Sequence, residues 1–135
     1  YEAEPLVIDK WFALQAMIPE AGTLALVERL MGDPAFSLAN PNRARALIGS
    51  FALSNPTQFH RADGAGYEFL ATNVLRLDPA NPQVAARLLT AFGTWKSMEP
   101  GRREKAVAAR RRIAGQGSLS PDVADIVQRS LARDT

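Results

Sequence analysis

A capping residue followed by proline occurs at nearly equal spacing along this chain. Asn40-Pro41, Asn81-Pro82 and Ser120-Pro121 lie 41 and 39 residues apart, and a further pair, Asn55-Pro56, lies between the first two. Asn and Ser side chains accept hydrogen bonds from the unpaired N–H groups of a helix's first turn. Proline suits the first helical position because its missing N–H would be unpaired there. The pairs therefore predict helix starts.

Apolar residues recur at helical spacing along nearly the whole chain, and no run of alternating β-branched residues indicates a strand. The expected helices span residues 6–18, 24–31 (capped by Thr23), 41–53, 66–77, 82–98, 101–114 and 121–132, with a short turn at 57–60. A period near 40 residues with two helices per period is typical of HEAT and armadillo repeats. We therefore predict an all-α fold, in which antiparallel helix pairs stack as an irregular HEAT/armadillo-like α-solenoid in a single domain, 1–135. An ordinary helical bundle is the alternative.

The first expected helix is apolar almost all round, with Trp11 and Phe12 as its largest side chains. A helix that is apolar on all sides is expected to be covered on all sides. We therefore expect residues 6–18 to need a partner, which is either a part of a larger protein or a second copy of the chain in a dimer. The first residue is Tyr1 and not Met, which fits a fragment of a larger protein.

Residue counts exclude most metal and thiol chemistry. The 135 residues contain no Cys and a single His, His60. A disulfide framework, a Cys-ligated metal, a thiol nucleophile and a site with several His ligands are therefore excluded within this sequence. We expect His60 to be structural, with its ring hydrogen-bonded to a backbone carbonyl of the 54–65 loop. No catalytic residue, metal site or cofactor is predicted in these residues.

Charge does not indicate nucleic-acid binding by itself, because the net charge is only +2. The segment 102–112 has six basic residues against Glu104 alone, and a basic helix can contact phosphates. It has no interleaved aromatic residues for base stacking, so a solvated outer helix is favoured over an RNA-binding face.

No apolar run approaches the roughly 18 residues of a membrane span. Asp63-Gly64-Ala65-Gly66 follows no strand, and so a tight loop leading into a helix is favoured over a phosphate-binding loop.

Three arginines, Arg43, Arg45 and Arg87, lie early in expected helices that begin with Asn-Pro. The helix dipole disfavours cations at that end. Helix ends on one side of a solenoid line a common edge, so Arg45 and Arg87 could meet there and bind a carboxylate. Exposed or salt-bridged arginines are the simpler interpretation.

Four separate blocks of the sequence are similar to the last part of the bacterial aminopeptidase N family. The blocks are Asp9–Ala16, Asn40–Phe51, Phe59–Tyr67 and Asn81–Leu88, in the family's order and spacing. Over most of residues 9–132 the chain resembles roughly the second half of the all-helical domain that ends these zinc-dependent aminopeptidases.

The resemblance implies a parent enzyme whose zinc and catalytic groups lie in an upstream domain of the same chain. The family's Gly-Ala-Met-Glu-Asn motif and its zinc motif have no counterpart here. The resemblance also implies that the helical domain caps the active-site cavity and that Arg45, Gln83 and Arg87 contribute to the substrate-binding wall. The expected partners are the catalytic domain and a peptide, with no nucleic acid and no membrane, in the cytoplasm. A stand-alone helical-repeat scaffold and a basic RNA-binding module are the rival interpretations.

Overall fold

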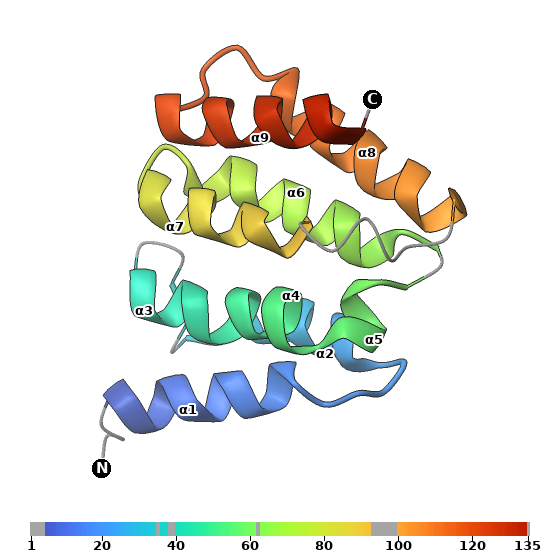
Figure 1. Ribbon diagram of the computed structural model, residues 1–135. Coiled ribbons are helices and arrows are strands. Elements are labelled where there is room, and N and C mark those ends of the chain that lie inside the picture. The colour runs from blue at the N-terminus through green and yellow to red at the C-terminus, as the bar shows by residue number, and fades with distance from the viewer. Residues whose placement is uncertain (1–4, 35, 38–39, 62, 93–99, 135) are drawn as a thin grey trace. The chain divides into compact units, whose positions relative to one another are not determined.

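The computed structural model describes residues 5–34, 36–37, 40–61, 63–92 and 100–134. Every regular element in these residues is a helix and none is a strand, which confirms the all-α prediction (Figure 1). None of the helices in the described part of the chain is long and apolar enough to cross a membrane. The chain divides into two compact units, residues 1–59 and 60–135, and each is described by itself.

The first unit begins with the long helix α1 and ends in a run of short helical segments. Its elements are α1 (Pro5–Ala16), α2 (Thr23–Leu30), α3 (Pro41–Ala44), the π-helix η1 (Arg45–Gly49), α4 (Ser50–Ser54) and α5 (Pro56–Phe59). Because α3, η1 and α4 follow one another without a break, the helix expected at 41–53 is present but contains a π-helical turn. The core of the first unit contains aromatic rings. The Phe12 ring lies edge-on to Phe36, with the ring centroids 5.8 Å apart, and Phe51 lies edge-on to Phe59, with the centroids 6.4 Å apart.

The capping predictions for this unit are partly correct. Asn40 caps α3 as expected, because its Oδ1 accepts hydrogen bonds from the N–H groups of Asn42 and Arg43. Thr23 is not an N-cap. It lies in the first position of α2 after Gly22, and its hydroxyl donates to the Ile18 carbonyl at 2.6 Å.

Helix α5 begins at Pro56, as the Asn55-Pro56 pair predicts, and Asn55 has a further role that was not predicted. Its side chain is buried, and Nδ2 donates to the carbonyls of Ala16 and Ile18 at 2.8 and 2.9 Å. Ala16 is the last residue of α1 and Ile18 lies just past it, where the last C=O groups of a helix lack intrahelical partners. Asn55 therefore satisfies the C-terminal end of α1 and ties it to the α4–α5 junction.

The second unit consists of two helical hairpins. Its helices are α6 (Ala65–Leu77), α7 (Pro82–Leu88), α8 (Pro100–Ala114) and α9 (Pro121–Asp134). In Figure 1, α7 runs back along α6, and α9 runs back along α8. The core contains the fully buried rings of Tyr67 and Phe92, whose centroids lie 6.1 Å apart, together with buried aliphatic side chains from all four helices.

The helix expected at 82–98 is shorter in the structure. The α-helix α7 ends at Leu88 and continues as a 3₁₀ turn over 89–92, while 93–98 lie outside the described residues. Asn81 occupies the N-cap position before Pro82, but its side chain makes no capping hydrogen bond, so that part of the prediction was wrong.

Ser120 caps α9 as predicted, with its Oγ accepting from the Val123 N–H at 3.3 Å. The same hydroxyl donates to Asp78 at 2.5 Å, and the Ser120 N–H donates to the other oxygen of that carboxylate at 2.7 Å. Because the Asp78 side chain is buried at the end of α6, this pair fixes the start of α9 against α6. The two hydrogen bonds from Ser120 to the Asp78 carboxylate add a charge-assisted interaction to the N-cap of α9.

The loop before α6 has the predicted tight form. Gly64 has φ 77°, in the left-handed region that favours glycine, and Asp63 Oδ1 accepts from the Ala65 N–H. This hydrogen bond is the main reason that the pKa of the Asp63 carboxyl is lowered. A Cβ at position 64 would lie 2.8 Å from Lys105 Cδ, so the close approach of α8 also requires glycine here.

Candidate functional site

Arg45, the first predicted site residue, lies in η1 with an exposed side chain. Its Nη2 donates to Asn42 Oδ1 at 2.5 Å. A single π-helical turn inside an α-helix is rare and is found frequently at functional sites. The neighbouring Arg43 has a structural role instead, because its Nε donates to Asp9 Oδ1 at 2.6 Å and both side chains are mostly buried.

Gln83 and Arg87, the other two predicted site residues, both lie on α7 with exposed side chains. They are four residues apart, so they share one face of the helix, as expected. The structure corrects the argument from the helix dipole, because α7 ends at Leu88 and Arg87 therefore lies in its last turn. A cation is favoured at that end of a helix.

The structure thus brings together two of the three predicted side chains. Arg45 belongs to the first compact unit, whereas Gln83 and Arg87 belong to the second. Their gathering on one edge stays a prediction. Together they would offer two guanidinium groups and an amide, which can bind a carboxylate or a peptide carbonyl.

His60 is half-buried and contacts an aromatic partner. Its Nδ1 lies 2.8 Å from the Tyr67 hydroxyl, and the two ring centroids lie 5.5 Å apart. The prediction of a structural His60 with a backbone carbonyl partner missed this contact with Tyr67. Burial, and secondarily the positive charge of Arg102, lower the pKa of the imidazole below its ordinary value. The ring is therefore neutral over a wider pH range than an exposed histidine.

Fewer basic side chains of helix α8 are available to bind phosphates than its composition indicates. Arg110 is completely buried, so the prediction of a solvated outer helix is wrong at this residue. Arg112 is exposed, but its guanidinium bonds to the Glu68 carboxylate, the Glu68 carbonyl and the Thr72 hydroxyl of α6. Two of the basic residues of α8 therefore hold the second unit together, which reduces the positive charge left for phosphates.

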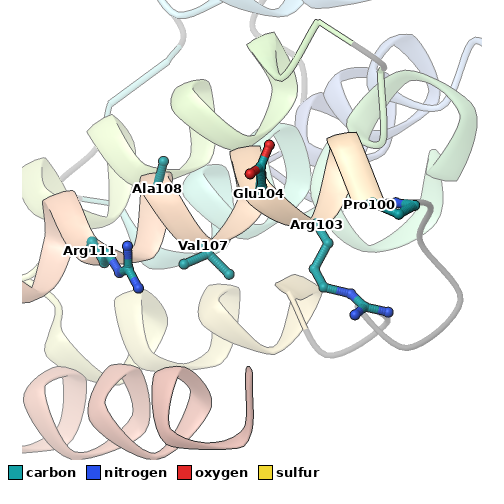
Figure 2. Close-up of a pocket in the computed structure, with 6 residues that line it drawn as sticks. All are labelled: Pro100, Arg103, Glu104, Val107, Ala108 and Arg111. Carbon is teal, nitrogen blue, oxygen red and sulfur yellow. The ribbon is translucent and has the colours of Figure 1, made fainter. Parts of the chain in front are cut away.

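One side of α8 borders an open hollow of about 600 Å³. It is lined by Pro100, Arg103, Glu104, Val107, Ala108 and Arg111. Figure 2 shows Val107 between Arg103 and Arg111, with Glu104 directed away from both arginines. This surface was not predicted, although the spacing of three and four residues between its members was a usable signal in the sequence.

A metal site is not present among the residues that the structure describes, in which no three His, Cys, Asp or Glu side chains are grouped for an ion. A catalytic zinc ion needs three protein ligands and an open position. The residues present therefore do not fit the zinc that the resemblance implies, and no chemical step in these residues uses it.

Comparison with known proteins supplies the class of this chain. The described helices bury apolar faces as the helices of a repeat domain do, and the ARM repeats named in the family model confirm the predicted solenoid class. A family model described as "Domain of unknown function (DUF3458_C) ARM repeats" matches residues 1–132, and the chain belongs to this family.

The matched relatives are aminopeptidases. The chain is 44% identical over 127 residues to Aminopeptidase N of Escherichia coli (strain K12), and 41% identical over 131 residues to Aminopeptidase N of Caulobacter vibrioides. The matches cover 94% and 97% of this chain but 15% of each relative. A crystal structure of Legionella pneumophila aminopeptidase A in complex with aspartic acid superposes with a TM-score of 0.89 at 32% identity, over 96% of this chain and 15% of that one. The chain thus spans about 15% of the length of its relatives.

Proposed function

We propose that this chain is the non-catalytic C-terminal helical-repeat domain of a zinc-dependent metallo-aminopeptidase, which removes N-terminal amino acids from peptides. The observation that carries the proposal is the 39–44% identity to three proteins named Aminopeptidase N over nearly the whole chain. In this proposal the upstream catalytic domain of the same polypeptide is the main partner. The zinc ion and its chemistry belong to that domain, in the cytoplasm.

The role of the chain in that enzyme is to cap the active-site cavity and to contribute part of its substrate-binding wall. Arg45, Gln83 and Arg87 are the residues proposed to face the substrate. Their exposed side chains support this assignment, as does the shared helix face of Gln83 and Arg87. An arginine guanidinium donates two parallel hydrogen bonds to a carboxylate, so this wall would orient the part of a peptide that lies beyond the scissile bond.

The test is an Arg87→Ala substitution in the complete polypeptide, compared with Arg76→Ala. Arg76 is also exposed and also lies in the last turn of a helix in the second unit, which makes it a matched control. The loss of a hydrogen bond to a charged group costs about 1.5–3 kcal/mol. We therefore expect kcat/KM for a peptide with a free carboxylate to fall by roughly 10- to 100-fold in Arg87→Ala, with a smaller loss for a short chromogenic amide and an unchanged Tm. Equal kinetics of Arg87→Ala and Arg76→Ala on both substrates would contradict the assignment.

A further inference from the structure

Helix α7 and the 3₁₀ turn that follows it are buried except along one narrow line. Seven of the ten residues from 83 to 92 are buried, and the three exposed ones are Gln83, Arg87 and Thr90. Steps of four and three residues place these side chains on one side of the helix, and the second step enters the 3₁₀ turn, in which residues three apart are aligned. We call these three residues the α7 stripe.

The three polar side chains of the α7 stripe differ in what they can bind. Among the residues that the structure describes, the side chains of Gln83 and Arg87 have no hydrogen-bond or ion-pair partner. Thr90 is different, because its hydroxyl donates to the Arg87 carbonyl at 2.7 Å. With its proton used in this bond, the Thr90 oxygen can only accept a further hydrogen bond. The stripe therefore offers an acceptor at Thr90 beside the donors of Arg87.

The length of the α7 stripe corresponds to a short stretch of extended peptide. Seven residues of helix rise about 10 Å, which equals roughly three residues of an extended chain. Each residue of such a peptide other than proline presents one N–H donor and one C=O acceptor. The Arg87 guanidinium suits a carbonyl or carboxylate of the peptide, and the Thr90 oxygen suits an N–H.

We propose that Thr90 is a specificity-determining residue, which accepts a hydrogen bond from one backbone N–H of the peptide substrate. The inference rests on the proposed function, because it takes the peptide as the ligand of Gln83 and Arg87 and adds a third residue to their wall. A bound peptide displaces the water that hydrates an exposed hydroxyl, so an N–H replaces the lost hydrogen bond. Proline or an N-methylated residue at this position cannot replace it. The favoured substrates are therefore peptides that reach Thr90 with a free N–H.

The experiment is an N-methyl scan of one pentapeptide substrate with the complete polypeptide. Each backbone N–H beyond the scissile bond is replaced by N–CH₃ in turn, and kcat/KM is measured for every peptide with the parent enzyme, Thr90→Val and Thr90→Ser. Valine keeps the branched shape of threonine without the hydroxyl, whereas serine keeps the hydroxyl. Thr72→Val is the matched control, because Thr72 is also an exposed threonine of the second unit whose hydroxyl makes a hydrogen bond, in its case with Arg112.

We expect methylation at one position to lower kcat/KM by roughly 3- to 10-fold in the parent, in Thr90→Ser and in Thr72→Val, which is the range for a neutral hydrogen bond. In Thr90→Val we expect the methylated and unmodified peptides to differ by less than about twofold at that position. The ratio of two peptides measured on one variant does not depend on how much of the enzyme is folded, so a lower Tm of Thr90→Val does not affect the comparison.

The same scan profile in Thr90→Val as in the parent would overturn the proposal, because a loss caused by the bulk of the methyl group persists without the hydroxyl. A parent enzyme that is insensitive to methylation at every position would overturn it as well. Arg87→Ala and Arg76→Ala, measured on the unmodified peptide, separate the two proposals. A loss specific to Arg87→Ala with an unchanged scan in Thr90→Val removes only this inference, whereas equal kinetics of the two arginine variants contradict the proposed substrate-binding wall.

Discussion

Arg110 shows how a charged residue can serve as part of an interior. Its Nε donates to the Ala106 carbonyl at 3.1 Å, and its Nη1 donates to the Ser130 hydroxyl at 2.5 Å. The guanidinium carbon lies 5.5 Å from the centre of the Phe92 ring. A buried cation is costly unless hydrogen bonds and favourable charge interactions replace its hydration. Arg110 therefore links α8 to α9 and does not contribute to a basic surface.

His60 gives the chain a defined response to acid. Its pKa is lowered from 6.5 in the folded state, mainly by burial. Between that lowered pKa and 6.5 the unfolded chain binds more protons at this residue than the folded chain does, so the residue destabilises the fold as pH falls through this window. Above it, both states are neutral and the contribution is constant.

We accordingly expect urea unfolding of the 135-residue chain to show a loss of stability between pH 7.5 and 5 that is smaller in His60→Gln. The free energy of unfolding at each pH is the quantity to compare, because the substitution also changes the contact with Tyr67 at all pH values. If the free energy of unfolding changes equally with pH in the two proteins, the pKa of His60 does not change on folding and the expectation is wrong.

At the scale of single residues, the sequence predicted exposure better than partnership. The exposed positions of Arg45, Gln83 and Arg87 follow from their polar helix faces. The role of Asn55 could not be predicted, because its partners, the carbonyls of Ala16 and Ile18, are 39 and 37 residues away and are brought to it only by packing. The burial of Arg110 could not be predicted for the same reason, because its hydrogen-bond partner Ser130 belongs to another helix.

At the scale of elements, the predicted helix starts at 41, 82 and 121 agree with the structure because each is fixed by a local signal, a proline in the first turn. The early end of α7 had no such signal. The π-helical turn of η1 was also not predicted, because the buried residues Ala44, Leu47, Ile48 and Phe51 keep α-helical spacing across it.

The start of α6 provides a prediction at this scale. Gly64→Ala would place a Cβ against Lys105 and force a non-glycine residue to φ 77°. We expect the free energy of unfolding to fall by about 1–2 kcal/mol, the cost of a left-handed conformation for residues other than glycine. Gly117→Ala is the control, because no atom lies within 4 Å of a Cβ built there. Equal losses of unfolding free energy in the two variants, measured with urea, would show that neither the backbone conformation of Gly64 nor its contact with Lys105 affects stability.

At the scale of the whole molecule, repeat architecture was predictable because its signals are local and periodic. The spacing of the cap–proline pairs indicated a two-helix repeat, and membership of an ARM-repeat family confirms that class. The proposed substrate-binding wall is different, because it requires Arg45 to lie close to Gln83 and Arg87. That arrangement depends on the packing of two compact units and has no signature in local sequence.

The central claim is that this chain takes part in a zinc aminopeptidase without supplying its zinc site. The direct measurement is the zinc content, together with the chelator-sensitive hydrolysis of an alanyl reporter, of the complete polypeptide and of the 135-residue chain. We expect one zinc ion and chelator-sensitive hydrolysis for the complete polypeptide. We expect neither for the short chain, because one His and no Cys cannot provide three ligands of the usual kind. Stoichiometric zinc and chelator-sensitive hydrolysis in the short chain, or their absence from the complete polypeptide, would contradict the claim.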